Sequence, residues 1–138
     1  MRLSLAEMGA QVLNTADGRA KTALSLQYAQ AWQEARAAGN TLEIGTAPAP
    51  DHPARPEAPR LCAPKDVAKR KPGSPEGRIA LLHAVAHIEL NAVDLHWDII
   101  VRFSETRLPT GFFDDWVQAA AEESKHFNLM CDCLENLN

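Results

Sequence analysis

The distribution of proline sets the strongest limit on how this chain folds. Eight of the nine prolines lie between positions 48 and 75, and the ninth is Pro109. Proline lacks a backbone N–H and breaks helix interiors, so residues 41–77 are expected to form an extended strap that connects two structured parts. Those parts are residues 1–40, expected to be an N-terminal helix pair, and residues 78–138, expected to be a helix hairpin.

Both flanking segments carry helix signals. Ser4 and Glu7 form a capping-box pattern before a short helix over residues 5–13, and Asp17 is placed to cap a second helix that ends near residue 39. Two long helices follow, over 79–103 and from about 114 to 137, separated by a break that contains Pro109. No stretch shows the alternation of a strand. The sequence therefore predicts an all-α fold that ends in a long antiparallel helix hairpin.

Length and charge exclude several classes of protein. A chain of 138 residues with 46% hydrophobic and 23% charged residues is expected to fold as one small domain or as part of one. The net charge of −4 gives no strong nucleic-acid signal, although residues 65–78 carry a local charge of +3 that is interpreted as a solvated part of the strap. Glu7 interrupts any signal-peptide core, and no uncharged apolar run reaches the roughly 18 residues that span a bilayer.

The cysteines suggest a compartment. Cys62, Cys131 and Cys133 are odd in number and lack CxxC spacing, which is typical of free thiols in a reducing environment. We therefore expect a cytoplasmic protein that has no membrane partner.

Polar side chains occupy unexpected positions in the two long helices. In the last helix an apolar stripe with steps of three and four contains a carboxylate and an imidazole spaced Glu-x-x-His, which are Glu123 and His126. The stripe comprises Phe112, Trp116, Ala119, Glu123, His126, Met130, Cys133 and Leu137. The preceding helix has Glu89 at the centre of a similar stripe. A buried carboxylate needs a proton, a counter-charge or a metal, so each of these groups is expected to have a partner.

The predicted hairpin brings the three groups to one height. Glu89 lies about as far from the connecting loop in its helix as Glu123 and His126 do in theirs. One Glu from one helix and Glu-x-x-His from the next is half of the ligand set of di-iron and di-manganese carboxylate proteins. Carboxylate oxygens with few imidazoles favour iron or manganese over zinc. The sequence thus predicts a metal site at Glu89, Glu123 and His126, and the alternative is a structural cluster of buried polar groups.

Other polar residues are weaker candidates. His83 and His87 have the spacing of a zinc-protease helix, but Ala84 occupies the position of the general base, so this interpretation is rejected. The two histidines are interpreted instead as packing residues or as residues that hydrogen-bond to a metal ligand and orient it. Asp94 is interpreted as a helix-surface residue or as a carboxylate that orients a ligand. His96 lies about 10 Å along the helix from Glu89, too far to share an ion.

Three stretches resemble a known family. Residues 78–92, 113–117 and 121–127 are similar to an uncharacterised bacterial ferritin-like family, a domain of unknown function, and the resemblance extends over the whole chain. It implies a ferritin-like helical bundle with a dinuclear iron or manganese site to which Glu89, Glu123 and His126 contribute. The pattern is more distantly similar to diiron hydroxylases that modify tRNA, which implies oxygen-dependent oxidation or hydroxylation.

The chain also departs from that family. Members continue into a further helix pair that supplies a second Glu and a second Glu-x-x-His, so this chain is expected to match only the N-terminal part and to form half of a bundle. The expected partner is therefore the missing C-terminal helix pair or, by self-association, a second copy whose symmetry supplies the same ligands. Truncation is the simpler interpretation. The competing functional hypothesis is a metal-free helical interaction module whose exposed seam binds a partner.

Overall fold

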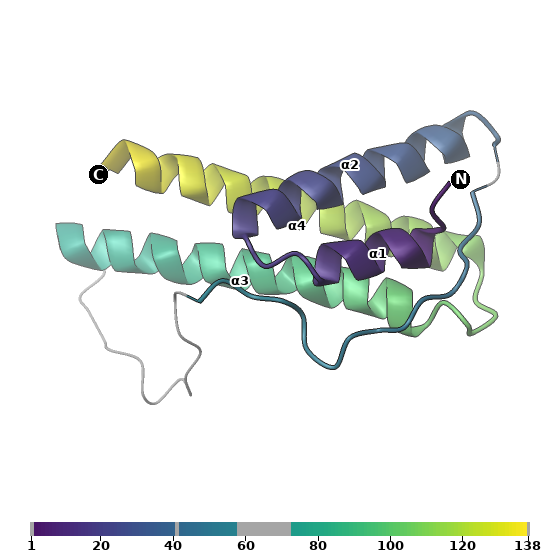
Figure 1. The fold of residues 1–138 in the computed structure, drawn as a ribbon. Helices are drawn as coiled ribbons and strands as arrows, with labels where there is room; N and C mark the ends of the chain where they lie inside the picture. Colours follow the sequence, from purple (N-terminus) through teal and green to yellow (C-terminus); the bar gives the residue numbers. More distant parts are fainter. Residues whose placement is uncertain (1, 41, 58–72, 138) are drawn as a thin grey trace.

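The computed structural model describes residues 2–40, 42–57 and 73–137, and these residues form an all-helical bundle. Its elements are α1 (Leu5–Leu13), α2 (Gly18–Ala37), α3 (Pro75–Arg102) and α4 (Thr110–Leu137). In Figure 1, α3 and α4 run antiparallel as two long rods, with α1 and α2 lying along them. The predicted all-α fold with its long hairpin is confirmed. None of the described helices has the length and apolar character needed to cross a membrane.

The helix starts follow their capping residues. The Ser4 side chain accepts from the Glu7 N–H while the Glu7 carboxylate accepts from the Ser4 N–H, which completes the predicted capping box. Asp17 caps α2 as expected. Helix α3 begins earlier than predicted, because Ser74 provides a cap and Pro75 occupies the first helical turn, where its missing N–H has no cost. Helix α4 likewise begins at Thr110.

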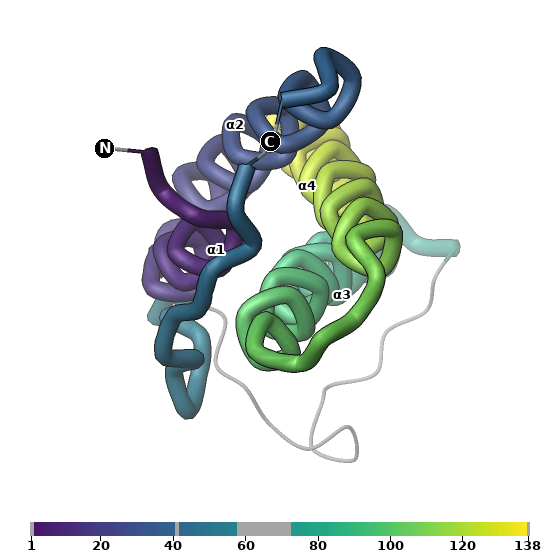
Figure 2. Tube along the Cα trace, turned by 90° about the vertical axis from the view of Figure 1, so that its right-hand side faces the viewer, coloured from purple at the N-terminus to yellow at the C-terminus, as the bar shows by residue number. Residues whose placement is uncertain are grey.

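The main core lies where α1 and α2 cover one side of the hairpin. The largest fully buried side chains come from all four helices and include Trp32, Trp97 and Phe113. Figure 2 views the molecule end-on and shows α1 and α2 together on one side of the α3–α4 pair. No helix of the described residues lies on the opposite side. One side of the hairpin is therefore buried and the other is open.

The described part of the strap is tied to the helices. The N–H groups of Leu5 and Ala6 donate to the carbonyls of Glu43 and Ile44, and the N–H of Ala54 donates to the carbonyl of Leu13. These bonds hold the strap along α1 as an extended surface segment, as its prolines predict. Cys62 and most of the basic stretch at 65–78 lie outside the described residues.

Candidate metal centre

Helices α3 and α4 bring Glu89, Glu123 and His126 together on the open side of the hairpin. The His126 Nδ1 lies 3.3 Å from a carboxylate oxygen of Glu123 and 3.7 Å from one of Glu89. One ligand atom from each residue lies within 4.8 Å of the other two. We name these three residues the triad. The sequence-based estimate that they share one height along the hairpin agrees with this geometry.

The triad is less buried than the sequence suggested. The side chains of Glu89 and Glu123 are 21% and 26% exposed, and that of His126 is 52% exposed. The predicted stripe on α4 is wrong by one residue, because the buried positions are those next to it, at Phe113, Val117, Ala120, Ser124 and Phe127. The physical reason is the position of α2. Because α2 packs against α4, the buried face of α4 is the one that contacts α2 and not the predicted stripe. At the loop end of the hairpin, the stripe residues Phe112 and Trp116 line an apolar groove between α3 and α4.

Neither carboxylate of the triad is paired with a Lys or Arg within the part of the chain that the structure describes. The basic side chain beside them is the imidazole of His126. Two half-buried carboxylates and one imidazole carry net negative charge unless a cation joins them. The arrangement is therefore chemically suited to a divalent ion.

The remaining candidate residues lie on other faces. His83 and His87 line a cavity of about 430 Å³ beside α2, together with Phe127, Cys131 and Leu134. Asp94 is buried and paired with Lys21 of α2, so it is no surface residue and does not face the triad. Asp98, one turn further along α3, forms an exposed i, i+4 ion pair with Arg102.

The Lys21–Asp94 pair is a buried feature that the sequence did not reveal. The Lys21 ammonium donates to the Asp94 carboxylate and, over 2.8 Å, to the Ala54 carbonyl. Burial lowers the pKa of Lys21 and raises the pKa of Asp94, and the ion pair opposes both shifts. A second polar group, Ser25, accepts from the Trp97 indole and bonds to Ser124. These groups connect α2 to the hairpin.

His96 lies two turns from Glu89 along the same face of α3. Its ring packs on Trp116 with centroids 5.2 Å apart, and its Nδ1 is buried with no hydrogen-bond partner in the structure. Burial lowers the pKa of His96, against a hydrogen bond to the Ala119 backbone that raises it. His96 thus packs against Trp116 and is separate from the triad.

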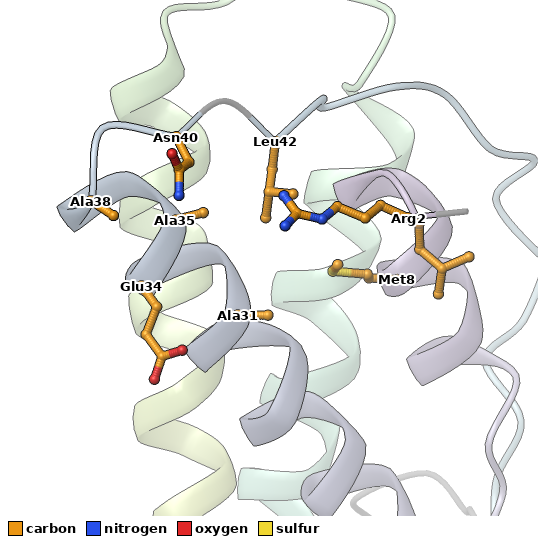
Figure 3. Close-up of a pocket in the computed structure, with 9 residues that line it drawn as sticks. Arg2, Met8, Ala31, Glu34, Ala35, Ala38, Asn40 and Leu42 are labelled. Atoms are coloured by element: carbon orange, nitrogen blue, oxygen red, sulfur yellow. The ribbon is translucent and has the colours of Figure 1, made fainter.

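The triad lines none of the three cavities of about 360, 420 and 430 Å³. Figure 3 shows a cavity of about 420 Å³ between α1 and α2, where the Arg2 side chain extends between Met8 and Leu42. An apolar cavity of about 360 Å³ lies at the loop end of the α3–α4 groove, lined by Ile99, Phe103, Thr106, Leu108, Phe112 and Trp116. This second cavity shares two residues with the groove-lining stripe, Phe112 and Trp116.

Comparison with known proteins places the chain in a family. Residues 14–138 match the family described as "Protein of unknown function (DUF455)". The chain belongs to this family. An uncharacterized protein of Haemophilus influenzae is 47% identical over an alignment of 87 residues, and the match covers 59% of this chain and 30% of that protein. The chain therefore spans less than a third of this family relative. No solved structure matches the chain.

Proposed function

We propose that the triad binds a divalent metal ion, iron or manganese, and that it forms half of a ferritin-like dinuclear carboxylate centre. The single observation that carries the proposal is the convergence of three ligand atoms from two helices within 4.8 Å of one another. Metal–ligand bonds of about 2.0 to 2.3 Å put the ligands of one ion roughly 3 to 4.5 Å apart. The separations of 3.3 and 3.7 Å from His126 Nδ1 fall in that range.

The donor set supports iron or manganese. Carboxylate oxygens are hard ligands and the imidazole is an intermediate one. The soft thiol ligands Cys131 and Cys133 are not part of the cluster. Glu-x-x-His on one helix with Glu on its neighbour is the pattern that bundle-core carboxylate sites use. Three protein ligands also leave positions on the ion for water or substrate. With dioxygen, iron bound in this way supplies oxidation or hydroxylation chemistry, the reaction class that the resemblance implies.

The chain's own residues have defined tasks in this proposal. Glu89 and Glu123 bind the ion and neutralise its charge, and His126 binds through Nδ1, which faces both carboxylates. These three side chains supply the ligand atoms of the site, whose task in this proposal is metal binding.

A direct binding measurement tests the proposal. Apo-protein is titrated calorimetrically with Mn²⁺, and with Fe²⁺ under anaerobic conditions. We expect Glu89→Ala, Glu123→Ala and His126→Ala each to weaken binding by at least about 100-fold, since ligand loss exceeds the 10–100-fold effect of losing a group that supports a ligand. Glu122→Ala and His87→Ala are matched controls, because these side chains lie outside the triad. Equal affinity in triad and control variants overturns the proposal.

One observation favours a second candidate, a metal-free interaction module. The outward side chains of Leu81, Ile88 and Leu95 are more than half exposed, and apolar groups of this size at regular spacing are typical of binding surfaces. In this alternative the triad is a set of polar contacts at the rim of a partner interface. The same titration separates the two, because the module binds neither metal ion.

A further inference from the structure

The cavity between α1 and the end of α2 combines apolar walls with a basic side chain. The apolar residues that line it come from α1 and the residues before it, from α2 and from the strap, and they are Leu3, Met8, Ala31, Ala35, Ala38 and Leu42. The polar residues that line it are Arg2, Glu34 and Asn40. Its volume of about 420 Å³ lies within the range of about 300–1,000 Å³ that is usual for small-molecule sites.

The Arg2 guanidinium has no counter-ion within the part of the chain that the structure describes, where the ion pairs all join other residues. Figure 3 shows its side chain extending between Met8 and Leu42 toward α2. On α2, the carbonyl of Ala35 is already bonded, because it accepts from the Asn40 N–H over 2.8 Å. A guanidinium stays charged at neutral pH, so this position favours an anion.

The acidic residue at the rim does not act as that anion. The Glu34 carboxylate accepts from the Gln30 side chain over 2.8 Å, one turn earlier in α2. Figure 3 shows this carboxylate pointing away from Arg2. The Asn40 side chain lies near Ala35 at the end of α2, and its amide group is a further hydrogen-bond donor. The polar groups of the cavity therefore suit an anionic ligand that accepts hydrogen bonds.

The shape of these groups identifies the class of ligand. A planar guanidinium donates two parallel N–H bonds to a carboxylate, and such charge-assisted bonds are stronger in apolar surroundings. The side chains of Met8, Ala31 and Ala35 offer no strong hydrogen-bond partner, so they suit the hydrocarbon part of a ligand. A free phosphate or sulfate ion suits the cavity less well, because it has no apolar part that would cover these walls.

From this arrangement we propose that the cavity binds a small carboxylic acid with a short apolar chain. The carboxylate pairs with Arg2 and accepts from Asn40, and the apolar chain lies against Met8, Ala35 and Leu42. The site lies on the side of the hairpin that α1 and α2 cover, and it shares no residue with the triad. It is therefore independent of the proposed metal centre.

Binding of hexanoate tests the proposal. The full chain, labelled with ¹⁵N, is titrated at neutral pH while its backbone amide signals are followed by NMR. We expect saturable shifts that are largest at Met8, Ala35 and Leu42. Arg2→Gln should weaken binding by about 10-fold or more, because it removes a charge-assisted hydrogen bond. 1-Hexanol has the same chain without the charge and acetate has the charge without the chain, so each should bind at least about 10-fold more weakly.

Two further variants serve as controls. Arg107→Gln removes an exposed arginine in the loop between α3 and α4, outside the cavity, and should bind hexanoate as the wild type does. Ala35→Leu keeps the charge and favours the helix but fills part of the cavity, so it should weaken binding.

Three results overturn the proposal. They are the absence of saturable shifts at the cavity, equal affinity of the wild type and Arg2→Gln for hexanoate, and equal affinity of the wild type for hexanoate and 1-hexanol. None of them affects the proposed metal centre, because the two sites share no residue.

Discussion

The buried ion pair between Lys21 and Asp94 has the largest predicted effect on stability of any single contact here. Lys21 is fully buried and Asp94 is 4% exposed, so each charge has left water almost completely. The Ala54 carbonyl is a further partner of the ammonium. A charge in this setting is tolerated only while its partner is present.

We predict that Lys21→Met destabilises the fold by about 3–5 kcal/mol, because it leaves the Asp94 carboxylate buried without its cation. The double variant Lys21→Met, Asp94→Leu should recover most of that loss, since it removes both charges and adds apolar packing. Urea unfolding of the wild type and of the single and double variants gives the coupling free energy between Lys21 and Asp94. Additive losses would contradict this account.

The same pair tests whether Asp94 serves the triad. Asp94 contacts Lys21 and lies on a different face of α3 from Glu89. We therefore predict that Asp94→Asn lowers the free energy of unfolding, while the affinity of the folded protein for Mn²⁺ stays within about threefold of the wild-type value. A loss of 10–100-fold in affinity is the effect expected if Asp94 orients a ligand.

At the scale of elements, α2 and α4 show what periodicity predicts and what it does not. The existence and ends of these helices follow from local signals such as Asp17 and the Pro109 break. Their buried faces do not, because α2 buries the polar residues Lys21, Thr22 and Ser25, whose hydrogen-bond partners lie on α3, on α4 and in the strap. An apolar stripe predicts the buried face of a helix only when no network of hydrogen-bonded polar residues packs against the neighbouring helix in its place. The offset on α4 has the same cause.

Gly9 of α1 marks a close approach between helices. A Cβ at this position would lie 2.7 Å from Val101 Cγ2 and 3.1 Å from Trp97 Cε3, both on α3. We predict that Gly9→Ala destabilises the protein by up to about 2 kcal/mol, because the overpacking cost of roughly 1–3 kcal/mol outweighs the gain of about 1 kcal/mol in helix propensity.

Gly111 in α4 is the control for Gly9. No atom lies within 4 Å of a Cβ built there, so Gly111→Ala should be neutral or stabilising by up to about 1 kcal/mol in the same urea titration. Equal effects at the two glycines would show that propensity, and not packing between α1 and α3, decides both.

For the whole molecule, the sequence predicts the hairpin and the height of the triad but not its exposure. Heights follow from residue counts along helices of fixed rise, and these counts place Glu89 opposite Glu123. Exposure depends on where the other helices pack, and α1 and α2 gather on a single side. The exposure of the His126 side chain thus depends on how the four helices pack together, and the sequence pattern of α4 alone does not predict it.

This one-sided assembly leads to a prediction about thermal stability. The triad exists only when α3 and α4 are paired, so a metal that binds it stabilises the folded state by mass action. At a Mn²⁺ concentration 100 times the dissociation constant the gain is about 2.7 kcal/mol, which raises the Tm of a chain of this size by roughly 8 °C. Differential scanning calorimetry should show this rise for the wild type and for Glu122→Ala, and no rise for Glu123→Ala. An equal rise in Glu123→Ala would place the stabilising ion elsewhere in the molecule.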